Sequence, residues 1–150
     1  MEKLFIDSLL MLFERDLNKL ESEIKLYPNE DLVWAVEGDI KNSAGNLCLH
    51  LCGNLQHYIG RNMGGTTYVR ERDKEFSSSP VPRETLLDLI ATTRDVVRTT
   101  LQNTNPATLE TDYPEKVFSN TMTHAYFLIH LESHLNYHLG QINYHRRLLS

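Results

Sequence analysis

The stretch HLESHLNYHLGQINYHRR, residues 130–147, repeats apolar side chains at intervals of three to four residues and places four histidines among them. Such a period is that of an α-helix with one buried face. The apolar side chains expected to point inward are Phe127, Leu131, Leu135, Ile142 and Leu149. The stretch therefore predicts a long amphipathic helix that begins near Asn120 and runs almost to the end of the sequence.

Three of these histidines fall inside the predicted buried face. With His134 at 0° on a helical wheel of about 100° per residue, His138 lies at about 40° and His145 at about 20°, whereas His130 lies at the edge of the apolar stripe. Burying an uncharged imidazole without a partner costs free energy. His134 and His138, four residues apart, can meet one metal ion, and hydrogen-bonded histidines are the alternative.

Three more helices are expected upstream of this stretch. Apolar periodicity and helix-capping residues place them at about 2–26, from Asn42 or Ser43 to about Arg61, and 82–103. Leu32, Val33 and Trp34 fall in a predicted loop, and residues 104–118 in another. Four long helices in 150 residues predict an all-α, four-helix bundle with long connections, as one domain over residues 1–150.

Composition excludes several functional classes. Fifteen Lys and Arg residues against twenty Asp and Glu residues give a formal charge of −5, and Arg146 and Arg147 form the only basic cluster, so no nucleic-acid partner is expected. No apolar run of about 18 residues predicts a membrane span, and Asp7 interrupts the one stretch that resembles a signal peptide. We expect a cytoplasmic protein. Cys48 and Cys52, spaced four apart, are expected as buried thiols.

A third metal ligand is sought on the helix predicted from about 42 to 61. His50 lies near the boundary of its apolar face, and His57 is the competitor. The chain has no Glu-x-x-His pair for a di-iron site, no H-E-x-x-H and no C-x-x-C-H. A site of three imidazoles leaves coordination positions open, as in catalytic zinc. The sequence leaves open whether His57, His130 or His145 joins the site.

Three phrases resemble the DinB-like superfamily of metalloenzymes. They are NSAGNLCLH, residues 42–50, HLNYHLGQI, residues 134–142, and YVRERDKEF, residues 68–76, which is similar to a branch of unknown function. The resemblance implies a DinB-like bundle in which His50, His134 and His138 bind a divalent metal. Zinc or nickel is expected, because three imidazoles suit several borderline metals. It also implies a homodimer.

The resemblance implies several functions. Members of the superfamily include thiol-dependent S-transferases, so we expect a metal site that activates a low-molecular-weight thiol for attack on a small electrophile. The alternatives are a metal-dependent hydrolase that activates water, and a stress-related protein that binds metal without catalysis. No catalytic residue beyond the metal ligands can be assigned, and the sequence identifies neither substrate nor pathway.

Four further residues are candidates for supporting roles. Gln141 is expected near −20° on the wheel, where it can face the site or make a hydrogen bond elsewhere. Asn54, one turn after His50, is a candidate for orienting that ring. Arg70 and Arg72 can pair with a carboxylate of a thiol cofactor, or belong to a solvated charged loop.

Overall fold

The computed structural model describes residues 1–150, and the all-α prediction is confirmed. The only β-type pairing is one bridge between Asp112 and Thr123. None of the helices combines the length and the apolarity that a bilayer span requires. The helices are α1 Glu2–Leu26, α2 Glu30–Val33, α3 Ala44–Leu55 with a π-helical turn Gln56–Arg61, α4 Arg72–Ser77, α5 Arg83–Asn103, a 3₁₀ turn Pro106–Glu110, and α6 His124–Leu149.

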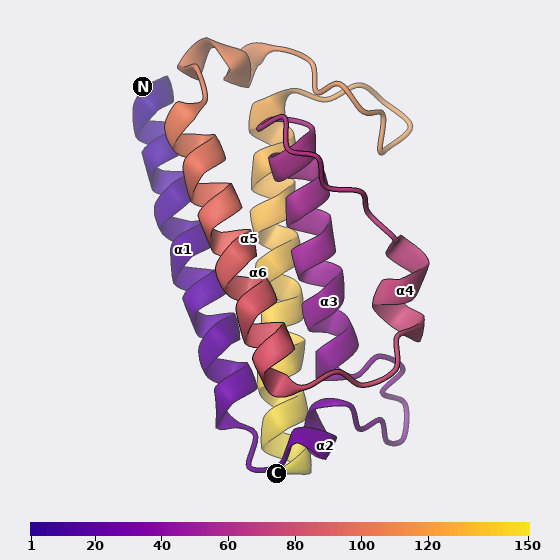
Figure 1. Cartoon of the computed structure of the whole chain (residues 1–150). Helices are drawn as coiled ribbons and strands as arrows, with labels where there is room; N and C mark the ends of the chain where they lie inside the picture. Colours follow the sequence, from indigo (N-terminus) through magenta and orange to yellow (C-terminus); the bar gives the residue numbers. More distant parts are fainter.

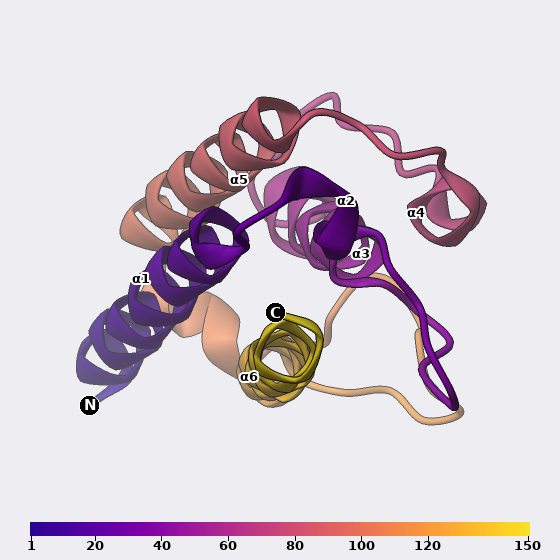
Figure 2. The same ribbon diagram turned by 90° about the horizontal axis from the view of Figure 1, so that it is seen from below.

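The four long helices lie side by side around one apolar core. Seen end-on, α1 lies beside α5 and α6, and α3 lies beside the same two helices (Figure 2). Helices α1 and α6 run in one direction and α3 and α5 in the other (Figure 1). Because α3 and α5 are parallel neighbours, the chain between them must return along the length of the molecule.

This return segment, residues 62–82, carries the short helix α4 along the outer side of α3 (Figures 1 and 2). The sequence predicted a polar connection here, and it predicted a loop where α2 forms. Both predictions missed helices of four to six residues. Each presents one buried side chain, Val33 in α2 and Glu75 in α4, which is too little apolar periodicity to recognise.

Helix boundaries follow the capping residues. Ser43 accepts a hydrogen bond from the Asn46 amide, and α3 with its π-helical turn ends at Arg61, as predicted. Helix α6 begins at His124 instead of near Asn120, because Thr123 caps it and the backbone just before it pairs with the chain near Tyr113. Leu149, predicted to point inward, is only half-buried at the C-terminal end of α6.

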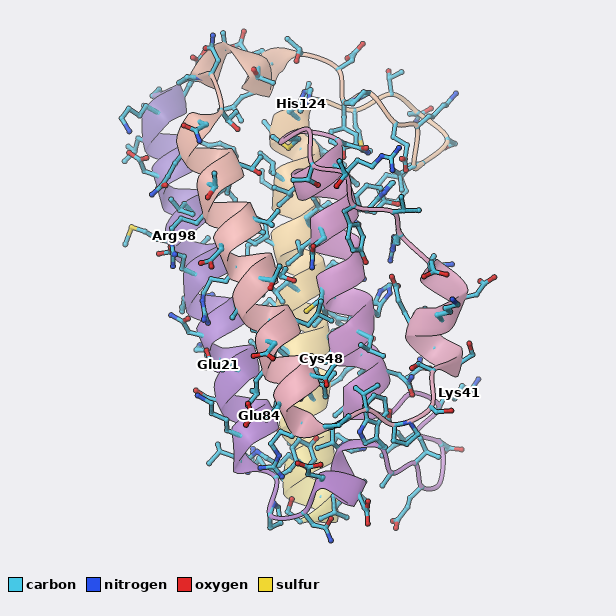
Figure 3. The ribbon with its side chains drawn as sticks, viewed as in Figure 1. Glu21, Lys41, Cys48, Glu84, Arg98 and His124 are labelled. Atoms are coloured by element: carbon cyan, nitrogen blue, oxygen red, sulfur yellow. The ribbon has the colours of Figure 1, made fainter.

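Both cysteines are fully buried free thiols, as predicted. Figure 3 shows Cys48 on α3 in the middle of the molecule. A hydrogen bond with Cys52, together with burial, raises the pKa of the Cys48 thiol well above its ordinary value. A buried thiol that resists ionisation is a poor nucleophile, so these side chains serve the core.

Candidate metal centre

Three imidazoles from two helices converge where α3 faces α6. The Nε2 atom of His134 lies 3.1 Å from Nε2 of His50 and 3.1 Å from Nε2 of His138. One ring nitrogen from each of the three residues lies within 4.8 Å of the others. The antiparallel packing of α3 on α6 brings His50 to the pair on α6, and the four-residue spacing places that pair on one helix face. The sequence-predicted trio is thus brought together.

Two rings of the cluster favour the neutral form. Burial, together with the neighbouring His138 and His50, lowers the pKa of His134 to about 3. Burial also lowers the pKa of His138. A neutral imidazole is the form that binds metals. His134 and His138 are therefore neutral at pH 7 and can coordinate a metal ion through a ring nitrogen.

The hydrogen bonding within the cluster is incomplete. The Nε2 atom of His134 offers either one N–H or one lone pair, so its contacts with His50 and His138 cannot both be full hydrogen bonds. In addition, the buried Nδ1 of His134 has no partner. A zinc–imidazole bond of about 2.0–2.1 Å places tetrahedral ligand atoms about 3.3 Å apart, close to the two separations seen here. The donor set and its spacing fit a divalent ion.

Hydrogen bonds to the opposite ring nitrogens turn two of the rings toward the cluster. The Nδ1 of His50 donates to Oε1 of Glu75 at 3.0 Å, and the Nδ1 of His138 donates to Oε1 of Gln141 at 2.7 Å. Fixing the proton on Nδ1 leaves the Nε2 lone pair free for a ligand. Of the two positions expected for Gln141, the structure shows the one that faces the cluster, in contact with His138.

Glu75 was missed by sequence reasoning, and its presence changes the interpretation of two other residues. Arg70 is not free to bind a cofactor carboxylate, because its Nε and Nη2 each donate to Glu75 at 2.9 Å. Asn54 does not orient His50, since the ring nitrogens of His50 make their contacts with Glu75 and His134 and none with Asn54. The phrase YVRERDKEF offers three acidic side chains, and nothing in their order distinguishes Glu75 from Glu71 or Asp73.

The other candidate histidines lie outside the cluster. His57 pairs with Glu115 at 2.8 Å, and His130 stacks on Phe127 with ring planes 11° apart. His145 is buried and uses both nitrogens in hydrogen bonds with protein groups. The sequence left open whether His57, His130 or His145 joins the cluster. The structure groups only His50, His134 and His138.

Aromatic side chains border the cluster on its outer side. The ring of Phe76 lies 4.9 Å from that of His50, and Tyr137 lies 5.2 Å from His138. The Arg72 guanidinium lies 5.9 Å above the Phe76 ring. His134 and His138 are only half-buried, so a small ligand can approach from this side.

The chain matches a known protein family over most of its length. The sequence profile of the DinB superfamily matches residues 12–142, a range that contains all three clustered histidines. No curated protein matches the chain.

Proposed function

Because the chain belongs to the DinB superfamily, we propose that His50, His134 and His138 bind one divalent metal ion. The observation that carries this proposal is the convergence of three imidazoles whose Nε2 atoms have only one another as partners. The family resemblance described above supports the same three ligands. Zinc or nickel is the proposed ion, since imidazole nitrogens suit both.

The proposed reaction is the activation of a small thiol. A divalent ion with open coordination positions would lower the pKa of a bound thiol or water molecule. The chain supplies no thiol of its own, because Cys48 and Cys52 are fully buried. The nucleophile therefore comes from solution, as a low-molecular-weight thiol that attacks a small electrophile.

Two side chains near the cluster support this proposal, one by binding the thiol and the other by holding a metal ligand. Arg72 is exposed beside Phe76 and is not paired with a carboxylate, so its guanidinium can bind a carboxylate of the thiol in two-point geometry. Gln141 holds the His138 ring through Nδ1 and donates to the Tyr137 hydroxyl at 3.3 Å. In this proposal the chain orients the ligands and binds the polar end of the thiol.

Metal content tests the ligand assignment. Untagged protein should bind one ion per chain, and His138→Ala should lose most of it. The matched control is His130→Ala, which removes an imidazole two turns away on the same helix but outside the cluster. Full stoichiometry in His138→Ala would overturn the assignment.

Thiol binding is tested on cobalt-substituted protein. Glutathione, bacillithiol, mycothiol and cysteine are added in turn, and a sulfur-to-metal charge-transfer band with release of a proton is the expected result. Turnover is then assayed with haloaromatic and epoxide electrophiles. No spectral change with any thiol, in fully metallated protein, would rule out the transferase and leave the hydrolase and the non-catalytic metal-binding protein.

Assembly, domain organisation and location complete the proposal. We propose one cytoplasmic domain, a DinB-like four-helix bundle over residues 1–150, that pairs with a second copy of itself. The outer face of α6 supports this pairing, because large apolar side chains are exposed along it: Tyr126, Ile129, Tyr137, Tyr144 and Leu148. Light scattering that gives the 17.4 kDa monomer at micromolar concentration would contradict the dimer.

A further inference from the structure

The contact between Glu75 and His50 joins two parts of the chain that are distant in sequence. Glu75 lies in α4, and its Oε1 accepts from the His50 Nδ1 at 3.0 Å. Its side chain is 7% exposed. Burial opposes ionisation of this carboxyl, but hydrogen bonds from His50 and Arg70 lower its pKa overall. The residue is therefore a buried carboxylate that bonds to one of the three clustered rings.

Arg70 compensates the buried charge. Its guanidinium holds both carboxylate oxygens at 2.9 Å, and its own side chain is 9% exposed. A two-point arginine pair is the arrangement that best supports a carboxylate away from water. With Arg70 in place, Glu75 can stay ionised and accept a hydrogen bond from the Nδ1–H group of His50.

Gly53 provides the space for this carboxylate. A Cβ atom at position 53 would lie 2.0 Å from Oε2 and 2.9 Å from Cδ of Glu75. Glycine is otherwise a poor residue for the middle of a helix. The missing side chain is thus explained by the close approach of Glu75, and any larger residue would displace the carboxylate.

A second pair in the same region provides a contrast. His57 and Glu115 are 2.8 Å apart, but Glu115 is 41% exposed and no other imidazole approaches His57. That contact ties a loop to the end of α3 and nothing more. The His50 contact differs because the opposite nitrogen of the same ring faces the cluster.

We propose that Glu75 is a positioning residue that fixes His50 with its proton on Nδ1 and its Nε2 lone pair directed at the metal ion, and that Arg70 and Gly53 hold the carboxylate in place. This inference rests on the metal binding proposed above. Coupling between sites is reciprocal, so metal binding strengthens the His50–Glu75 bond by the same factor by which Glu75 strengthens metal binding. The α4 segment is therefore held more firmly in the metal-bound protein.

The first experiment measures zinc affinity by competition with a chromophoric chelator. Glu75→Ala is expected to weaken zinc binding about 10- to 100-fold, the usual effect of losing a partner of a ligating histidine. Glu115→Ala, which removes the partner of His57, is the matched control and should bind zinc within about two-fold of the natural protein. Gly53→Ala keeps the carboxylate in the sequence but displaces it, so it should weaken binding in the same direction.

The second experiment locates the proton of His50 in metal-free protein and then follows the response of α4 to zinc. Long-range ¹H–¹⁵N spectra of the metal-free protein should show His50 with its proton on Nδ1, and Glu75→Gln should weaken that preference. Hydrogen exchange of residues 68–77 should slow on adding zinc to the natural protein and change little in Glu75→Ala.

The outcomes separate the two proposals. Unchanged zinc affinity in Glu75→Ala, with one zinc bound per chain in the natural protein, would overturn the role of Glu75 and leave the metal site intact. A proton on Nε2 of His50 in the metal-free protein would also overturn it. A natural protein that binds no zinc, nickel or cobalt would overturn both.

Discussion

His134 and His145 lie on the same face of α6, eleven residues apart, and their surroundings differ completely. Both nitrogens of His145 have fixed partners, since Nδ1 accepts from the Tyr27 hydroxyl at 2.7 Å and Nε2 donates to the Ala35 carbonyl at 2.8 Å. His134 has a buried Nδ1 without a partner and an Nε2 that faces two other imidazoles. The first arrangement is complete within the protein, whereas the second leaves ring nitrogens without fixed protein partners.

Glu132, half a turn before His134, is a third polar side chain of α6, and its surroundings differ from those of both histidines. Its Oε2 is buried and has no donor, and it lies next to the fully buried Asp16. Burial raises the pKa of Glu132 to about 8, and the neighbouring Asp16 carboxylate contributes to the rise. At neutral pH Glu132 therefore keeps a proton and can donate it to Asp16. Three polar side chains of α6 are thus satisfied in different ways. His145 has protein hydrogen-bond partners, Glu132 keeps a proton, and His134 binds the proposed metal ion.

The largest loss of folding stability predicted for a single substitution concerns His145. Replacing it with Ala leaves the Ala35 carbonyl without its partner and leaves the Tyr27 hydroxyl with only a 3.4 Å hydrogen bond to the Ile142 carbonyl. It also opens a cavity, and together these changes should cost about 2–4 kcal/mol of folding free energy. For a chain of this size, each kcal/mol corresponds to roughly 2–4 °C in the melting temperature. Calorimetry of metal-free protein measures the loss, and zinc bound per folded chain should stay unchanged.

His134→Ala is the matched variant for that comparison. In metal-free protein it should change stability by less than about 1 kcal/mol, because it removes a ring whose polar atoms are incompletely satisfied. Zinc at 100 times its dissociation constant should stabilise the natural protein by about 2.7 kcal/mol and this variant hardly at all. If His134→Ala destabilised the metal-free protein as much as His145→Ala, the contrast between the two histidines would be wrong.

The second prediction concerns the pH dependence of stability. Because the pKa of Glu132 is raised in the folded protein, the folded state holds a proton that the unfolded state has released between about pH 4.5 and 8. Stability from this group is therefore full below that window and falls as pH rises through it, by at most about 1.4 kcal/mol per pH unit. Glu132→Gln, which cannot ionise, should flatten the slope in urea denaturation measured from pH 5 to 8.

The control for this prediction is Glu84→Gln, which changes an exposed carboxylate at the start of α5 (Figure 3). Its pH profile should run parallel to that of the natural protein across the window. Arg15 and Asn136 also face the carboxyl pair, and they are unchanged in both variants. Parallel profiles for Glu132→Gln and the natural protein would show that Glu132 ionises normally in the folded state.

The smallest predicted effect is at Gly140, between the two compared histidines. A Cβ atom there would meet nothing within 4 Å, and the residue is in the interior of α6. Gly140→Ala should therefore stabilise the chain by about 0.5–1 kcal/mol through helix propensity. Zinc affinity should not change. Thermal melts and chelator competition would check both, and a coupled change in affinity would mean that the cluster depends on local helix stability.

The sequence by itself determined the long helices and most of the candidate site. The 3.6-residue period of α6 is a local property of the chain, so it placed His134 and His138 on one face without knowledge of the fold. The caps at Ser43 and Pro82 are also local, and they marked the starts of α3 and α5 to within two residues. The family resemblance then selected His50 over His57.

Only the tertiary structure decided which polar groups meet. Glu75 reaches His50 because the return segment from α3 to α5 runs along the outer side of α3, and Asp16 reaches Glu132 because α1 packs against α6. His145 is excluded from the cluster for the same kind of reason, since Tyr27 and Ala35 occupy its nitrogens. Helical periodicity fixes the direction in which a side chain leaves its own helix axis. The partner that the side chain meets depends on how separate helices pack, and no local sequence pattern encodes that packing.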